Sequence, residues 1–221
     1  MKRFQFKLGM VLSCFVTISF LTSLGASAGY KKINFVTVLL PYGVSIDLSE
    51  EWSIKSYGQR IHLEKTVGSM LDLAGLTGVE KENSDIHFAG EYYLKGKANA
   101  TVNIRYYSHL GLTQKDAAKI RAEDVEELIK ESAIDSLLKL GATLIEWKGT
   151  EKVIINGITA FITEYKRGAL PGSGSFRVRL IRVFAGKQSF TLTVSYNEKD
   201  ALFFEIVTDA IIDSLKIKGI Y

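Results

Sequence analysis

The sequence predicts a single mixed α+β domain in which helices pack on an antiparallel β-sheet. The second half of the chain contains runs that alternate between apolar and polar residues, as strands with two different faces do. Two other segments repeat apolar residues at helical spacing. The 221 residues include only two prolines and no repeat or low-complexity stretch, so nothing divides the chain into two domains.

The clearest strand is predicted at 188–196, where apolar and hydroxyl side chains alternate at every position. We expect its apolar side to be buried and its hydroxyl side to face solvent. A tight turn at 185–187 and a strand at 175–184 should precede it. The apolar residues are Phe190, Leu192, Val194 and Tyr196, and the hydroxyl residues are Ser189, Thr191, Thr193 and Ser195.

A β-hairpin is predicted around Asn156-Gly157, because both central positions of a type I′ turn need a positive φ. Its strands should cover 152–155 and 158–167. Another alternating run at 101–107 brings the number of expected antiparallel strands to five or more.

Helices are expected before and after these strands. The segment 122–140 has an apolar stripe with acidic and basic residues mostly opposite it, and Gly141 suits the position just after a helix end. Its stripe consists of Val125, Leu128, Ile129, Ser132, Ala133, Leu137 and Leu140.

The last helix should begin after Asn197, whose side chain can cap it, with Asp200 in the first turn. A third helix is expected within 61–76, where Gly68 interrupts the pattern. The apolar stripe of the last helix is predicted to be Phe203, Ile206, Val207, Ala210 and Ile211.

Residues 1–28 have the layout of a secretory signal peptide. Lys2, Arg3 and Lys7 precede an apolar run that ends at Ala26-Ser27-Ala28, a small-x-small cleavage pattern. We therefore expect export, cleavage after Ala28 and a mature domain covering 29–221, periplasmic or secreted. An uncleaved anchor and lipidation at Cys14 are the alternatives, but the run is short and polar for an anchor and continues beyond Cys14.

Removal of the signal peptide changes the charge and the chemistry of the chain. Three of the 28 basic residues lie in it, which leaves 25 basic and 24 acidic residues, so a nucleic-acid-binding protein is not expected. The only cysteine lies there too, so the mature protein should have no disulfide and no thiolate chemistry. No stable membrane span is expected after processing.

The sequence contains no motif of a catalytic, metal or cofactor site. The three histidines, His62, His87 and His109, are far apart in the chain, and no calcium loop is present. No nucleophile elbow and no phosphate-binding glycine loop occurs either. We therefore expect no catalytic residues, no cofactor and no resident metal.

Two groups of residues are candidates for a partner surface. One consists of basic residues on the strands that flank the loop 168–174, and antiparallel pairing should add their charges into one positive patch. The other consists of one tyrosine from each of the pairs 92–93 and 106–107, because alternation turns one member of each pair away from the core. The candidates are Lys166, Arg167, Arg177, Arg179, Tyr93 and Tyr107.

The order of these segments resembles the PsbP-like fold family. The resemblance rests on the segment 40–52, on Glu146-Trp147-Lys148-Gly149, on the Asn156-Gly157 hairpin and on Asp213-Ser214-Leu215 at the end of the last helix. Ser49 departs from the usual proline of the first segment. The resemblance implies an α/β/α sandwich with a central, mostly antiparallel sheet, but it implies little about activity.

The sequence thus favours an exported, non-enzymatic binding or accessory protein whose partner is an envelope protein or an anionic surface. A carrier of a small ligand or lipid is the alternative, and a cleft sealed by the loop 168–174 would favour it. A hydrolase is a more distant alternative, which would require a histidine, an acid and a hydroxyl to meet in one pocket. The oligomeric state stays open.

Overall fold

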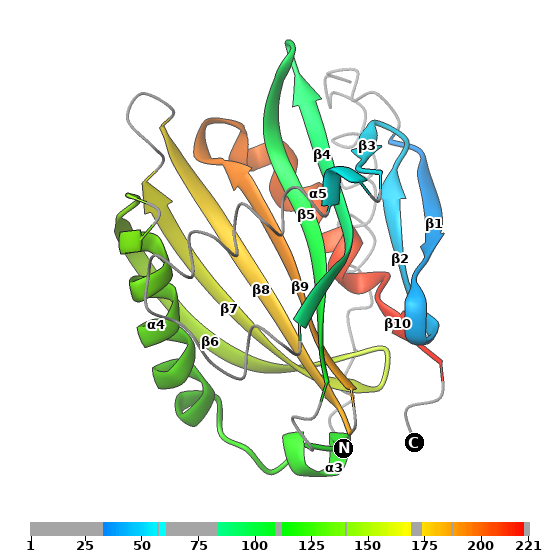
Figure 1. Cartoon of the computed structure of the whole chain (residues 1–221), viewed down its shortest axis with the longest axis vertical. Helices are drawn as coiled ribbons and strands as arrows, with labels where there is room; N and C mark the ends of the chain where they lie inside the picture. Colours follow the sequence, from blue (N-terminus) through cyan, green and yellow to red (C-terminus); the bar gives the residue numbers. More distant parts are fainter. Residues whose placement is uncertain are drawn as a thin grey trace, which may run out of the picture. The chain divides into compact units, whose positions relative to one another are not determined.

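In a computed structural model of the chain, a seven-stranded antiparallel sheet forms the centre of the domain (Figure 1). The structure describes residues 33–56, 58–60, 84–108, 112–139, 141–168, 174–186 and 188–218, and Asn34–Tyr221 form one compact unit. The strands lie in the order β3-β4-β5-β9-β8-β7-β6. They are β3 (Trp52–Ile54), β4 (Ser84–Leu94), β5 (Lys97–Ser108), β6 (Leu144–Ile155), β7 (Ile158–Gly168), β8 (Ser175–Ala185) and β9 (Gln188–Asn197).

The predicted α+β class and antiparallel sheet are confirmed, and so is the Asn156-Gly157 hairpin. Asn156 and Gly157 have φ values of 48° and 82°, as a type I′ turn requires. Gly186, at the predicted turn before β9, has a φ of 74°. The Asn156 side chain also donates hydrogen bonds to the carbonyls of Asp213 and Leu215, which ties the hairpin to the end of the last helix.

A three-stranded sheet lies in the same unit, in the order β1-β2-β10. Its middle strand is apolar and fully buried at Val44, Ile46 and Leu48, whereas β1 is exposed along most of its length. The strands are β1 (Phe35–Leu39), β2 (Val44–Ser49) and β10 (Lys216–Ile217), with a short 3-10 helix, η1 (Pro41–Gly43), between the first two.

One face of the central sheet packs against α5 (Ala201–Asp213), which follows a 3-10 turn, η2 (Glu198–Asp200). The Asn197 side chain caps this turn by accepting a hydrogen bond from the Lys199 amide. Strand alternation places the predicted apolar residues of β9 on this face, where all of them are buried. Below, we call this side of the sheet the α5 face.

The apolar stripe of α5 is rotated by about one residue from the prediction. Phe204, Val207 and Ile211 are buried against the sheet, whereas Ile206 is 60% exposed. The helix is apolar on nearly every side, so periodicity alone could not fix its orientation. Its acidic residues do fix it, because Glu205 and Asp209 pair with arginines on β8.

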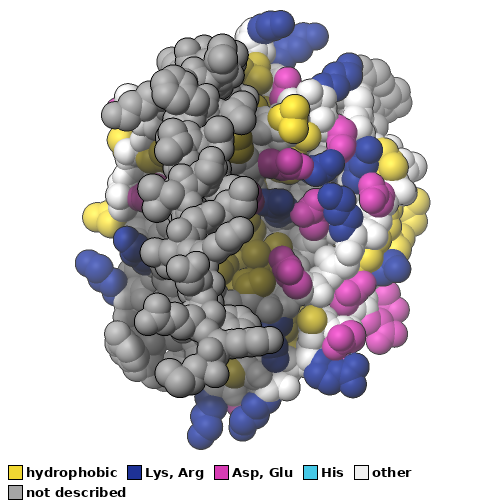
Figure 2. All heavy atoms as spheres, turned by 180° about the vertical axis from the view of Figure 1, so that it is seen from behind, with side chains coloured by type: hydrophobic (Ala, Val, Ile, Leu, Met, Phe, Trp, Pro, Cys, Tyr) yellow, Lys and Arg dark blue, Asp and Glu magenta, His cyan; other side chains and the backbone are white. Residues whose placement is uncertain are grey.

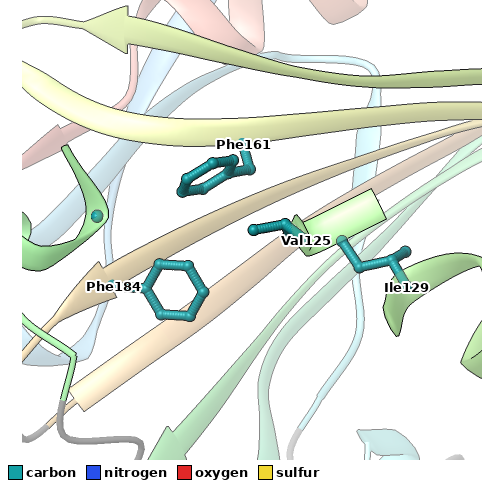
Figure 3. Packing of buried hydrophobic residues seen from close by; sticks show 5 residues of the cluster. Val125, Ile129, Phe161 and Phe184 are labelled. Atoms are coloured by element: carbon teal, nitrogen blue, oxygen red, sulfur yellow. The ribbon is translucent and has the colours of Figure 1, made fainter. Parts of the chain in front are cut away.

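The opposite face, which we call the α4 face, packs against α4 (Ala122–Lys139) over β6, β7 and β8, as Figure 1 shows, with α3 (Gln114–Ala117) at one end. Val125 and Ile129 insert beside Phe161 and Phe184 (Figure 3), whose rings meet edge to face at 5.9 Å. Full burial of such side chains stabilises the fold by roughly 1.5–3 kcal/mol each. Helices thus lie on both faces of the sheet, as the resemblance implied.

The buried stripe of α4 is narrower than predicted, whereas the end of the helix is as predicted. Leu128 was expected in the buried stripe of the helix 122–140 but is 70% exposed, because only the narrower stripe with i, i+4 spacing meets the sheet. Gly141 ends the helix with a φ of 67°, as predicted.

Three other predictions lie outside the described residues: the helix within 61–76, the signal peptide 1–28 and most of the loop 168–174.

Candidate binding face

The basic residues Lys166, Arg177 and Arg179 share the α5 face, as antiparallel pairing predicted. Lys166 lies opposite Arg177 in the β7–β8 register, and Arg179 follows two residues later on the same side. Figure 2, which shows the side opposite to that of Figure 1, has basic and acidic side chains interleaved next to one another. The sum of charges at this face therefore depends on the acidic neighbours.

Carboxylates neutralise each of these basic side chains. Arg177 pairs with Glu198 of η2 at 3.0 Å and with Glu205 of α5. Arg179 pairs with Glu164 at 3.2 Å and with Asp209. Two lysines complete this ionic network, with Lys166–Glu198 at 3.7 Å and Lys148–Glu164 at 2.7 Å.

The electrostatics of the ionic network contradict the expected positive patch. Hydrogen bonds from Arg177 lower the pKa of Glu198, and the carboxylate of Glu198 in turn raises the pKa of Arg177. Burial opposes ionisation of Glu164, but the hydrogen bond from Lys148 and the charge of Arg179 outweigh it, so its pKa is lowered. Among the described residues the four cations and four carboxylates balance, because α5 supplies acids that are distant in sequence.

Arg167 lies on the other face of the sheet. The alternation along β7 separates it from Lys166, and its guanidinium lies 5.0 Å from the centre of the Phe176 ring. Burial lowers the pKa of Arg167. It is therefore not part of the ionic network.

The tyrosine pairs alternate as expected, but the outward-facing members lie far apart. Tyr92 and Tyr106 are buried on the α5 face, where Tyr106 donates a hydrogen bond to the Pro41 carbonyl. Tyr93 is 50% exposed and donates to Glu91, whereas Tyr107 is half-buried beside Ser189. Nine residues of strand, roughly 30 Å, separate the ends of the β4–β5 pair at which Tyr93 and Tyr107 lie. The six candidate residues do not form one surface.

A different set of polar side chains does come together, on the α4 face of the three adjacent strands β5, β9 and β8. The register aligns Arg105, Thr191 and Arg182 in one row across these strands. We call the set the polar strip, and Tyr107 lies at its end. It consists of Thr101, Asn103, Arg105, Arg182, Ser189, Thr191, Thr193 and Ser195.

The hydroxyl side of β9 was expected to face solvent, and this expectation is wrong. Ser189, Thr191 and Ser195 are only 1–6% exposed. Their hydroxyl oxygens nevertheless have no hydrogen-bond partner in the part of the chain that the structure describes. Buried hydroxyls are usually paired, so three unpaired ones on one face are unusual.

The charge of the polar strip has one sign. Arg182 makes no ion pair or hydrogen bond through its guanidinium within the described ranges, and Arg105 lies two strands away. The residues of β5, β9 and β8 that share this side include no carboxylate, whereas Glu91 of the next strand, β4, lies opposite Thr101. The strip therefore places the positive charge of Arg182 beside hydroxyl groups that have no partner in the described chain.

Sequence reasoning did not combine these residues, although a signal was present. The polar side of 188–196 carries only serine and threonine, which tolerate burial, where a solvated strand commonly carries lysine or glutamate. The pairing of β5 with β9 could not be predicted from local patterns, because Arg105 and Thr191, which lie opposite each other in this pair, are far apart in the sequence.

The described residues contain no group of three or more side chains suited to hold a metal ion. The side chain of His87 and the whole of His62 and His109 lie outside the described part. No helix among the described residues is long and apolar enough to cross a membrane.

Comparisons with known proteins identify the fold. No family model and no curated protein matches the chain. The solution structure of cyanobacterial PsbP (CyanoP) from Synechocystis sp. PCC 6803 matches with a TM-score of 0.54 at 11% identity, covering 88% of this chain and 98% of that one.

Two further solved structures match more weakly. LpqN, involved in cell envelope biogenesis of Mycobacterium tuberculosis, matches with a TM-score of 0.45 at 10% identity, covering 85% of this chain and 92% of that one. The Ran-binding protein Mog1p of Saccharomyces cerevisiae matches with a TM-score of 0.44 at 8% identity, covering 84% and 96%. On the CyanoP match, and with the sheet order described above, the chain has the PsbP/Mog1-like fold.

Proposed function

We propose that this chain is an exported, non-enzymatic binding protein of the cell envelope that recognises an anionic group on its partner through the polar strip. One observation carries the proposal: Arg182, which makes no ion pair within the described ranges, and three buried hydroxyl groups without a partner there share a sheet face that bears no carboxylate on β5, β9 or β8. Such a face attracts negative charge and offers hydrogen-bond donors to it. The signal-like residues 1–28 support an envelope address.

The packing of the α5 face favours a partner-binding module over a carrier of an apolar ligand. The central side chains there, Ile104, Leu192 and Ile181, are fully buried, and so are Phe204 and Val207 of α5, which packs on this face. A carrier would need a gap between this sheet face and its helix, and the side chains fill the space instead.

The localisation part of the proposal is tested by the mass of the protein recovered from its native host. Cleavage after Ala28 should give a chain that begins at Gly29. A mass that includes Met1, or one that includes a diacylglyceryl group on Cys14, would contradict this part.

The binding part is tested by photo-crosslinking in intact cells. A photoreactive amino acid replaces Thr193, a half-buried member of the polar strip, and in a matched control it replaces Ile154, which is 68% exposed on the edge strand β6. We expect a defined crosslinked product from position 193 that disappears when Arg182→Glu is added. Equal products from both positions, unaffected by the charge reversal, would refute the role of the strip.

A further inference from the structure

We infer that β1 pairs in antiparallel orientation with β1 of a second copy of this chain, so that the three-stranded sheets of two molecules join into one. This self-association goes beyond the proposed function and involves a different part of the molecule. β1 lies at the edge of its sheet, where β2 is its only neighbour among the described strands (Figure 1). An edge strand presents a row of backbone N–H and C=O groups to which another strand can bond.

The ladder with β2 determines which backbone groups of β1 face the open edge. Just beyond the two ends of β1, the Leu40 amide donates to the Val44 carbonyl, and the Asn34 carbonyl accepts from the Glu50 amide. In an antiparallel ladder the residues of one strand bond alternately to one neighbour and to the other. The even-numbered residues of β1 therefore bond to β2, and the odd-numbered ones direct their N–H and C=O groups outward. The outward-facing residues are Phe35, Thr37 and Leu39.

The other described strand edges are protected against pairing, whereas β1 is not. β3 and β10 cover only three and two residues. β6 is long, but its register shifts at two places and it carries Lys148 and Lys152. Short strands, bulges and lysines are the devices that usually keep edges from pairing. β1 has five residues, none of them charged and none a proline, and its register against β2 is continuous.

The sequence of β1 is nearly symmetric about Thr37, and this symmetry favours a second copy over an unrelated strand. A twofold axis at Thr37 places Phe35 of one molecule opposite Leu39 of the other. It also places Val36 opposite Val38, so apolar side chains meet apolar ones. Phe35, Val36 and Leu39 are 38%, 46% and 79% exposed in the single chain, so pairing removes apolar surface from water.

The same register also satisfies the backbone of both edges. Thr37 exchanges two hydrogen bonds with its counterpart, and Phe35 exchanges two with Leu39 of the other molecule. Pro41 has no N–H, so the ladder ends after Leu39. Within β1, no other register pairs all three outward-facing residues of each strand.

The charges near the axis permit this pairing. Thr37 donates a hydrogen bond of 2.6 Å to Asp47 on β2, so each molecule brings one carboxylate toward the axis. With strands about 4.8 Å apart, the backbones of the two Asp47 residues lie three spacings, or about 14 Å, from each other. The Debye length is about 8 Å at physiological ionic strength, so salt screens most of their repulsion.

Disulfide crosslinking tests the register, because the chain from Gly29 onwards contains no cysteine. Thr37→Cys places the thiols of two molecules opposite each other, with about 5.5 Å between Cα atoms, a distance that a disulfide spans. Oxidised glutathione should convert this variant into a covalent dimer.

Leu39→Cys is the matched control for the register. Leu39 is 79% exposed, so random collisions should crosslink a thiol there readily. In the paired register, however, the two positions 39 are four residues apart along the strands, about 14 Å. Leu39→Cys should therefore give at most a tenth of the covalent dimer that Thr37→Cys gives.

The affinity is tested without crosslinks by sedimentation velocity. One short strand pair makes a small interface, so the parent chain should show a weak, reversible dimer between about 10 µM and 1 mM. Thr37→Pro removes an N–H that faces the open edge and none that bonds to β2, so the fold should persist while self-association weakens at least tenfold. Ile154→Lys, on the exposed edge of β6, is the control and should leave self-association unchanged.

Three results would overturn the inference: a chain that stays monomeric throughout this concentration range, a dimer that Thr37→Pro leaves intact, or equal crosslinking at positions 37 and 39. A monomeric chain would leave the β1 edge to a strand of another protein. If Thr37→Pro does not give a native circular dichroism spectrum, the comparison of Thr37→Cys with Leu39→Cys alone decides.

Discussion

The Glu126 carboxylate on α4 accepts a hydrogen bond of 2.8 Å from the indole Nε1 of Trp147 on β6. Its second oxygen accepts from the Thr150 amide at 3.0 Å. Between these two donors the β6–β7 register shifts at Gly149, whose φ of 113° is a conformation that side chains rarely adopt. One carboxylate thus fixes the helix to the irregular part of the strand through a side-chain donor and a backbone donor.

Glu126→Gln should lower the free energy of unfolding by about 1–3 kcal/mol, because an amide offers one acceptor oxygen where two donors are present. Urea denaturation measures the difference. Glu127→Gln, at the exposed neighbouring position, is the control and should change stability by less than about 0.5 kcal/mol. Equal effects of the two substitutions would show that the link between helix and bulge contributes nothing.

Tyr196→Phe should leave stability unchanged or raise it by up to about 1 kcal/mol. The Tyr196 ring is fully buried and stacks on Phe204, but its hydroxyl has no partner in the described chain. Tyr106→Phe is the matched comparison, since that hydroxyl donates to the Pro41 carbonyl at 2.9 Å. Tyr106→Phe should lower the free energy of unfolding by about 1 kcal/mol, as measured by thermal denaturation. A larger loss of stability for Tyr196→Phe than for Tyr106→Phe would show that the Tyr196 hydroxyl is paired in solution.

Asn156→Gly should cost about 1–2 kcal/mol even though glycine suits the turn. The substitution keeps the positive φ but removes hydrogen bonds of 2.8 and 2.9 Å to the carbonyls of Asp213 and Leu215. Lys95→Gly, in the β4–β5 hairpin, where Lys95 has a φ of 50°, removes no such bond and should be neutral or slightly stabilising. A similar effect of both substitutions in chemical denaturation would mean that the tertiary bonds of Asn156 add nothing.

Stability should fall in acid, and Glu198 should account for part of the loss. Hydrogen bonds from Arg177 lower its pKa in the folded chain below the ordinary value of 4.5. The stabilisation is therefore complete above about pH 4.5 and disappears as the pH falls through the lower folded-state pKa. Glu198→Gln should be less stable than the parent chain at pH 7, and the difference should narrow by pH 3, whereas a constant difference across that range would contradict the assignment.

The sequence predicted the strands of the second half well, because turn residues and alternation are local. Asn156, Gly157 and Gly186 take the positive φ values that their turns need, and Gly141 ends its helix as expected. Helix orientation was less predictable. In α5, apolar residues occur on nearly every side, and the ion pairs of Glu205 and Asp209 with β8 decide which side faces the sheet.

The candidate surface was harder to predict than the fold, because it depends on which strands are neighbours. The sequence predicted a positive patch at Arg177 and Arg179 because it does not show that the acids of η2 and α5 pair with these arginines in the fold. For the polar strip, the sequence showed some of the residues but did not show which other residues lie beside them. Its members were visible as alternating hydroxyls, but only the pairing of β9 with β5 and β8 adds Arg105 and Arg182 to them.

The strand order also sets the time at which the domain can form during synthesis. β9, one of the last strands to be made, pairs with β5 on one side and β8 on the other, so Ala100 meets Tyr196. Until the ribosome has released nearly the whole chain, the β3–β4–β5 strands and the β6–β7–β8 strands cannot join into one sheet. Contacts between such distant residues form slowly. For a protein exported as proposed, this delay keeps the chain unfolded long enough to be threaded through a translocation pore.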